Sequence, residues 1–169
     1  LPVQFVQNHH PSFLTDGQVG TGADEHRLGA VPGFGNLPQR VVMTLFENHF
    51  PQALVPAAVQ SVLNQSYGSF ELLIIDDASS DVTPRIAQAF AARDARVHYY
   101  RNPANLGVAR SRNRGVALAQ HSWIAFLDSD DRWRQDKLAR QVAYLQIHPV
   151  DLVYTGYDFM DTAGRKIRS

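Results

Sequence analysis

Three aspartates stand within four positions, directly after an uncharged, mostly apolar run. Residues 123–127 are followed by Asp128, Asp130 and Asp131. A buried charge costs free energy unless something pairs with it, so packing alone gives no reason for three carboxylates here. Side chains at i and i+2 of an extended segment point the same way, so Asp128 and Asp130 are expected to face one point. Mg²⁺ is typically held by one or two carboxylates together with substrate phosphates, so the pattern predicts a binding site for a metal ion and a diphosphate. We assign Asp131 to the turn that follows, a common role of aspartate.

Runs of strand length alternate with segments of helical spacing along most of the chain. The strand-like runs are 41–46, 70–75, 97–100, 123–127 and 151–154, and the helical segments are 54–63, 82–90, 107–119 and 135–146. Such alternation is typical of a parallel sheet with helices on both faces. We therefore predict an α/β fold with a doubly wound, mostly parallel sheet.

The aspartates fall at the edge of this predicted sheet where ligands bind. In open α/β sheets that place is the crevice outside the carboxyl ends of the strands. The segments that reach it are 44–47, 76–77, 102–107 and 128–131. Because three of these four segments are acidic or polar, we expect one functional site at this edge.

Other phosphate- and cation-binding motifs are absent or incomplete. The first predicted strand runs into LFENHFPQAL, which holds neither the G-x-G-x-x-G of dinucleotide folds nor a P-loop. An EF-hand calcium loop needs glycine at its sixth position, where Trp133 stands. A receiver domain needs an aspartate after its third strand, which here ends in Arg101 and Asn102. A haloacid-dehalogenase-like phosphatase carries Asp-x-Asp after its first strand, not its fourth.

The composition is that of one soluble globular domain. The chain has 169 residues, and its sixteen basic and sixteen acidic residues cancel, so no charge excess argues for nucleic acid as a partner. The absence of cysteine excludes disulfides and Cys-ligated zinc. The apolar runs are too short to span a bilayer, and the start of the chain has no signal-peptide pattern. We expect no transmembrane segment.

Residues 1–39 differ from the rest of the chain. They hold six of the eleven glycines and four prolines, without a sustained apolar period. This pattern predicts an irregular N-terminal extension or linker, followed by a domain over residues 40–169. Since the chain begins at Leu1 and not at methionine, we expect a processed or excised piece of a longer protein.

Four motifs occur together between residues 40 and 157. They are VVMTLFEN (41–48), SVLNQSYGSFELLIIDDASSDVT (61–83), RNPANLGVARSRNRG (101–115) and WIAFLDSDDRWRQDKLARQV (123–142). In this order they resemble an inverting family 2 glycosyltransferase with the GT-A, Rossmann-like fold. The resemblance implies a nucleotide-sugar donor, most often a UDP-sugar, and Mg²⁺ or Mn²⁺ as cofactor. It also implies a carbohydrate or lipid-linked acceptor, a role in polysaccharide biosynthesis, and a cytoplasmic location that allows peripheral attachment to a membrane.

The resemblance implies roles for residues at the ends of the first two predicted strands of the domain. Thr44 and Phe46 would border the nucleobase and ribose. Asp77 would accept a hydrogen bond from the uracil ring, while Asp76 organises the turn. Glu47 stands near the base where the family usually carries asparagine, and the loop after it is longer than expected, so the preference for the base stays open.

The resemblance places further contacts on the third predicted helix of the domain. Arg112 and Asn113 would make polar contacts near the donor. Arg110 and Arg114, on the same helix, are expected to face solvent.

The acidic segment would hold the metal and part of the nucleotide. Asp128 would touch the ribose or the water shell of the metal, and Asp130 would bind the metal directly. The reaction implied is displacement at the anomeric carbon, with an acceptor hydroxyl that loses its proton to a carboxylate base. The family places that base downstream of the last matching strand, so we expect it beyond Ser169. Asp158 and Asp161 are weaker choices for it, because a turn at residues 163–164 explains Asp161 better.

Two alternatives remain open at this point. The chain could be a catalytically incomplete nucleotide-binding or structural module. A nucleotidyltransferase on a related α/β fold is less favoured, because no Gly-rich, basic phosphate loop follows the first predicted strand of the domain.

Overall fold

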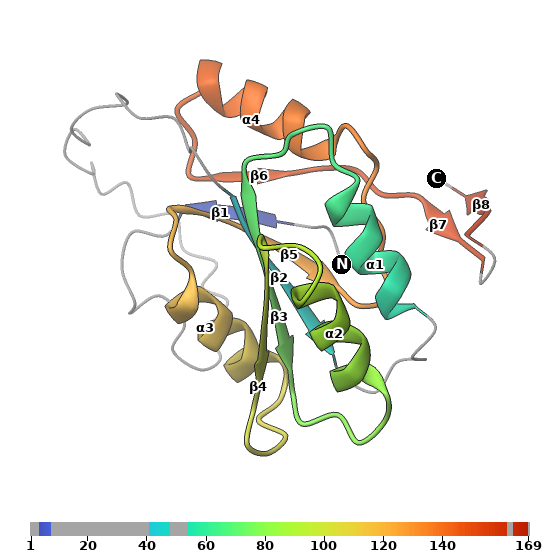
Figure 1. The fold of residues 1–169 in the computed structure, drawn as a ribbon. Helices are drawn as coiled ribbons and strands as arrows, with labels where there is room; N and C mark the ends of the chain where they lie inside the picture. Colours follow the sequence, from blue (N-terminus) through green and yellow to red (C-terminus); the bar gives the residue numbers. More distant parts are fainter. Residues whose placement is uncertain (1–3, 8–40, 48–53, 162–163, 169) are drawn as a thin grey trace.

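A six-stranded sheet with helices on both faces forms the body of the molecule (Figure 1). The computed structural model describes residues 4–7, 41–47, 54–161 and 164–168. Its strands are β1 (Gln4–Gln7), β2 (Val41–Glu47), β3 (Phe70–Asp76), β4 (Val97–Arg101), β5 (Trp123–Asp128), β6 (Leu152–Tyr154), β7 (Phe159–Met160) and β8 (Lys166–Arg168). Its helices are α1 (Val55–Leu63), α2 (Thr83–Ala91), α3 (Val108–Leu118) and α4 (Lys137–Ile147). The strands and helices predicted from residue 41 to residue 154 are confirmed, with bounds that differ by one or two residues.

The strand order in the sheet is β4-β3-β2-β5-β1-β6. Strand β2 pairs in parallel with β3 and β5, and β3 pairs in parallel with β4. Strand β1 is antiparallel to both of its neighbours, β5 and β6. The predicted α/β fold with a mostly parallel sheet is therefore confirmed.

Strand β1 corrects the prediction of an irregular extension over residues 1–39. Gln4–Gln7 forms a strand between β5 and β6, with Phe5 opposite Ala125 on one side and Val153 on the other. Four residues are too few to show a strand period, and this segment takes its structure from pairing with two neighbours. The rest of residues 1–39 lies outside the described residues.

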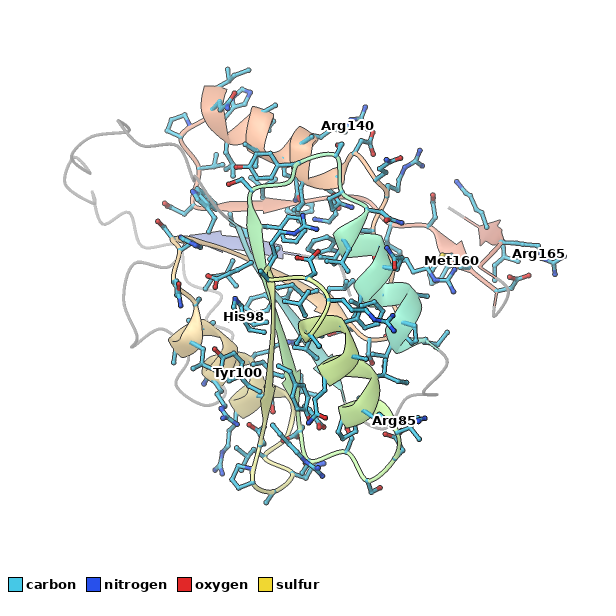
Figure 2. All side chains as sticks on the ribbon, viewed as in Figure 1. Arg85, His98, Tyr100, Arg140, Met160 and Arg165 are labelled. Carbon is cyan, nitrogen blue, oxygen red and sulfur yellow. The ribbon has the colours of Figure 1, made fainter. Side chains whose placement is uncertain are left out.

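The apolar side chains form two clusters, one on each face of the sheet. Helices α1, α2 and α4 cover one face, where Val59, Ala87 and Leu138 pack around β3 and β5 side chains such as Leu72 and Leu127. Helix α3 covers the other face, where its Val116 packs against a cluster of Leu73, Ile75 and Ile124. Tyr100 on β4 also packs against this second cluster, on the α3 side of the sheet (Figure 2). Burial on both faces explains why β3 has no exposed residue.

The β7–β8 hairpin lies apart from the sheet and the helices (Figure 1). Met160 and Arg165 mark its position in Figure 2. Gly164, with φ of 78°, makes the turn before β8. Among the described residues, no helix has both the length and the apolar character needed to cross a membrane.

Candidate active site

The carboxyl ends of β3, β2 and β5 lie side by side. The register pairs Glu47 of β2 with Asp76 of β3, and Phe46 with Asp128 of β5. Thr44 lies two residues earlier on β2, opposite Leu73 and Phe126. The backbone of β2 thus lies between the two acidic strand ends, whereas the side chains of Thr44, Phe46 and Glu47 lie outside the described part of the structure.

The segment after β5 is a turn. The Asp131 N–H donates to the Asp128 carbonyl oxygen at 3.0 Å, so the backbone of Asp131 closes the turn, while the capping role of its side chain stays a prediction. The extended geometry assumed for Asp128 and Asp130 is therefore wrong, because the strand ends at Asp128. The three carboxylates nevertheless stay close enough to interact. Burial raises the pKa of Asp131, and the negative charges of Asp130 and Asp128 raise it further.

This turn fits a divalent cation by its donor chemistry. Hard cations take oxygen ligands, and a cation would relieve the repulsion that raises the pKa of Asp131. Ser129 lies within the turn with 1% exposure, and its Oγ has no hydrogen-bond partner among the described residues. No group of three or more His, Cys, Asp or Glu side chains is arranged for metal binding in the described ranges. One or two carboxylates suffice for Mg²⁺ when substrate phosphates supply the other oxygens.

Arg112 of α3 is paired with Asp128. Its Nη2 lies 2.9 Å from Asp128 Oδ1, and the two side chains are 30% and 33% exposed. The Arg112 guanidinium carbon also lies 5.9 Å from the ring centroid of Phe126. Two residues predicted to contact the donor are therefore brought together from separate elements. Asn113 follows Arg112 on α3 and is half-buried.

Asp77 follows β3 and is held by the segment that leads into α3. Its Oδ1 accepts hydrogen bonds from Asn102 Nδ2 and the Leu106 N–H, both at 2.7 Å. Its Oδ2 accepts one from the Gly107 N–H at 2.8 Å. Burial disfavours the charged carboxylate, but these hydrogen bonds outweigh it and hold the pKa of Asp77 below its ordinary value. Asp77 is therefore an ionised carboxylate that only accepts hydrogen bonds.

Asp76 organises the turn after β3, as predicted. Its Oδ1 accepts the Ser79 N–H at 2.7 Å, and its Oδ2 accepts the Tyr99 hydroxyl at 2.6 Å. Arg101 Nε lies 3.7 Å from the same Oδ2. Ala78 in this turn has φ of 63°, a conformation that non-glycine residues rarely adopt.

Arg114 does not simply face solvent, as its position on the helix predicted. Its Nη1 donates to the Arg101 carbonyl oxygen at 2.8 Å and also to Asn102 Oδ1. Arg110, by contrast, is exposed, as expected. Asn102 lies in segment 102–107, which was predicted to reach this edge from its position directly after a strand, but no individual role was predicted for Asn102. For Arg114, a hydrogen-bonding role at the site was not predicted.

Asp158 and Asp161 are both paired near the β7–β8 hairpin. Asp158 Oδ1 lies 2.9 Å from Lys166 Nζ, and Asp161 Oδ2 lies 2.8 Å from Arg165 Nε. The Asp161 carbonyl oxygen also accepts the Gly164 N–H at 2.8 Å, which supports the role predicted for it in the turn. These contacts argue against either residue as a catalytic base.

Two solved structures share this fold at low sequence identity. Staphylococcus aureus TarS (residues 1–349) matches with a TM-score of 0.59 and 20% identity, over 65% of this chain and 33% of that chain. The mannosyltransferase PcManGT from Pyrobaculum calidifontis, in complex with GDP-Man and Mn²⁺, matches with a TM-score of 0.57 and 21% identity, over 72% and 36% of the two chains. These likenesses confirm the GT-A fold.

Relatives with clearer sequence similarity are glycosyltransferases by name. An uncharacterized glycosyltransferase of Haemophilus influenzae is 38% identical over 110 residues, which cover 65% of this chain and 44% of that protein. The glucosyltransferase WfgD of Escherichia coli is 32% identical over 121 residues, or 72% of this chain and 47% of WfgD. The chain thus spans less than half the length of these relatives. The family model "Glycosyl transferase family 2" matches residues 41–168, and the chain belongs to this family.

Proposed function

We propose that this domain binds the nucleotide-sugar donor of a glycosyltransferase, that the donor is a UDP-sugar, and that Mg²⁺ or Mn²⁺ assists the transfer. The observation that carries the proposal is the grouping of two acidic strand ends around β2. The register sets Asp76 and Asp128 on either side of the last residues of β2, with Asp77 directly after Asp76 and Asp130 two residues after Asp128.

Different residues at this edge of the sheet would contact different parts of the nucleotide. Asp77, an acceptor of hydrogen bonds, would bind the N–H of the uracil ring. Thr44, Phe46 and Glu47 on β2 would border the base and the ribose. Arg112 would contact the donor, with its neighbour on α3, Asn113.

Asp130, together with Asp128, would hold the cation. A bound cation would neutralise the negative charge that develops on the diphosphate leaving group. Arg112 already places its positive charge 2.9 Å from Asp128, and this contact orients the carboxylate. Asp128 would then contact the ribose or the water shell of the cation, and Asp130 would bind the cation directly.

The transfer would proceed by displacement with inversion. The oxygen of an acceptor hydroxyl forms a bond to the anomeric carbon, and the bond from that carbon to the diphosphate oxygen breaks. The electron pair leaves with the nucleoside diphosphate, and the hydroxyl proton passes to a base. Because Asp158 and Asp161 are paired with basic residues, we propose a carboxylate downstream of residue 169 as that base.

The names of two similar proteins include a UDP donor, whereas PcManGT is in complex with GDP-Man. WfgD is described as a UDP-Glc:alpha-D-GlcNAc-diphosphoundecaprenol beta-1,3-glucosyltransferase, which names both a UDP-sugar and a lipid-linked acceptor. Structures of S. aureus TarS are in complex with UDP and with UDP-GlcNAc. By these analogies we propose a UDP-sugar as donor and a carbohydrate or lipid-linked saccharide as acceptor.

Calorimetric titration with UDP, UTP, GDP and CDP, each in Mn²⁺ and in EDTA, tests the proposal. We expect UDP to bind most tightly, and to bind at least about tenfold more weakly in EDTA, a difference of about 1.4 kcal/mol. Tighter binding of UTP than of UDP would instead favour a nucleotidyltransferase. No binding of any nucleotide would contradict the proposal and leave a structural module.

A further inference from the structure

Three hydrogen bonds leave the Asp77 carboxylate little freedom. Oδ1 receives the Asn102 amide and the Leu106 N–H, and Oδ2 receives the Gly107 N–H. A carboxylate has about four lone-pair sites, two on each oxygen. Oδ1 is therefore fully used by its two donors, Oδ2 accepts the Gly107 N–H, and the Ser111 hydroxyl also acts on the carboxylate and lowers its pKa. Asp77 is also 4% exposed, so a ligand can reach it from few directions.

Asn102 uses every hydrogen-bonding atom of its amide in this network. Its Nδ2 donates to Asp77 Oδ1 at 2.7 Å and to Ser111 Oγ at 2.8 Å, and its Oδ1 accepts from Arg114. The side chain is 1% exposed. A reversed amide would set its oxygen against the Asp77 carboxylate and its NH₂ group against the Arg114 guanidinium. The two neighbouring charges therefore fix the orientation of the amide.

Arg114 connects the Asn102 amide to helix α3 and to the end of strand β4 by hydrogen bonds. It lies on α3, and its Nη1 donates both to Asn102 Oδ1 and to the backbone carbonyl oxygen of Arg101, at the end of β4. The chain of contacts Arg114–Asn102–Asp77 thus connects α3, β4 and the residue after β3. Charge-assisted hydrogen bonds are the stronger kind, and two of the links involve a charged group.

We infer that Asn102 and Arg114 are positioning residues, which hold Asp77 in one orientation so that its carboxylate selects a nucleobase that offers a ring N–H. The inference rests on the proposed function, in which Asp77 faces the base. Uracil carries a hydrogen on N3, whereas cytosine has a lone pair on N3 at the same place. An ionised carboxylate held in one orientation accepts from the first and repels the second. A carboxylate that is free to turn would lose this discrimination.

The ratio Kd(CDP)/Kd(UDP), measured by calorimetry in Mn²⁺, tests the inference. We expect a ratio of at least about ten for the wild type. Asn102→Ala and Arg114→Met should bring the ratio to within about threefold of one, and Arg114→Lys should restore part of it. Arg110→Ala, an exposed change on the same helix, serves as the matched control and should keep the wild-type ratio. Circular dichroism checks the fold of each variant, and Arg114→Met, a change in a half-buried side chain, supplies the test if Asn102→Ala does not fold.

Each other outcome has a definite meaning. Variants that weaken UDP and CDP by the same factor and keep the ratio would overturn the inference, because that result describes a merely structural role. A wild type that binds both nucleotides equally would also overturn it, while metal-dependent UDP binding would leave the proposed function standing. A wild type that binds no nucleotide would overturn the proposed function itself, and the inference with it.

Discussion

At the scale of single residues, Lys137 carries a charge in an unusual place. Its side chain lies at the start of α4 with 8% exposure, and its ammonium group is 4.4 Å from the ring centroid of Trp133. Its Nζ also donates to Gln141 Oε1. Burial lowers the pKa of Lys137 to about 7, from an ordinary value of 10.5. The folded domain therefore loses this proton at a lower pH than the unfolded chain does.

The pKa of Lys137 predicts how stability depends on pH. Below about pH 7 the lysine is protonated in both states, so the full cost of the buried charge is present. Between about pH 7 and pH 10.5 the unfolded chain holds a proton that the folded domain lacks, so stability increases with pH, by at most about 1.4 kcal/mol per pH unit. We expect Lys137→Met to raise the free energy of unfolding at pH 6 and to raise it less at pH 9, in urea denaturation. Lys166→Met, at an exposed position, is the control. An equal increase in the free energy of unfolding at pH 6 and at pH 9 would contradict the lowered pKa of Lys137.

Asp77 is an acid whose pKa is lowered in the folded state, so its ionised form stabilises the fold, whereas the charged form of Lys137 destabilises it. Its contribution to stability is present above the ordinary aspartate pKa of 3.8 and is lost as the pH falls through the folded value. Asp77→Asn removes one acceptor, so a buried donor loses its partner and the domain should lose about 1–3 kcal/mol at pH 7. UDP should also bind at least about tenfold more weakly.

The control for this change is Asp158→Asn. Asp158 is held by an ion pair with Lys166 near an exposed hairpin, where such a pair contributes about 0–1 kcal/mol. An Asp77→Asn variant that matches this control in both stability and UDP affinity would refute the role of the Asp77 carboxylate.

At the scale of elements, the loop that leads into α3 depends on Gly107. This residue has φ of 82° and ψ of 162°, a region of backbone conformation that is open essentially to glycine alone. Its N–H donates to Asp77 Oδ2 at 2.8 Å, so the same conformation that begins α3 also holds the carboxylate. The geometry of this loop and the geometry of the site are therefore linked.

Gly107→Ala should lower the free energy of unfolding by about 1–3 kcal/mol and weaken UDP binding. No atom lies within 4 Å of the added Cβ, so the expected loss comes from backbone strain alone. Gly156→Ala is the matched control, because its Cβ also meets open space and its φ is not positive. Thermal or urea unfolding of both variants gives the comparison, and equal stabilities would contradict the strain argument.

The elements were more predictable from the sequence than their contacts. The strands and helices between residues 41 and 154 follow from apolar runs and helical spacing, because each element buries one set of side chains locally. Strand β1 could not be predicted, since a four-residue segment becomes a strand only by pairing with β5 and β6. The network of Asn102 and Arg114 was equally hidden, because it depends on how α3 lies against the ends of β3 and β4.

At the scale of the whole molecule, the parallel register is what assembles the site. It brings the ends of β3 and β5 to either side of β2, although residues 76 and 128 are far apart in the chain. The position of the acidic segment at this edge followed from the fold class alone. Its local shape did not, because the strand ends at Asp128 and the next residues turn.

The same arrangement supports the proposal that the domain binds the donor. On that proposal, Asp77 accepts the N–H of the base, Arg112 contacts the donor and the acidic turn holds a cation. The chain belongs to glycosyl transferase family 2, and it spans less than half the length of the relatives that it matches. The acceptor and its base are accordingly proposals about the whole protein and not features of the described edge.

The most direct test of the central claim is the effect of Mn²⁺ on UDP affinity in the wild type, in Asp130→Asn and in Asp158→Asn, measured by calorimetry. We predict that removal of Mn²⁺ weakens UDP binding at least about tenfold in the wild type and in the Asp158→Asn control. In Asp130→Asn the affinity should be low and should no longer depend on Mn²⁺. UDP binding that is equally tight in EDTA, or a full Mn²⁺ effect retained in Asp130→Asn, would contradict the account.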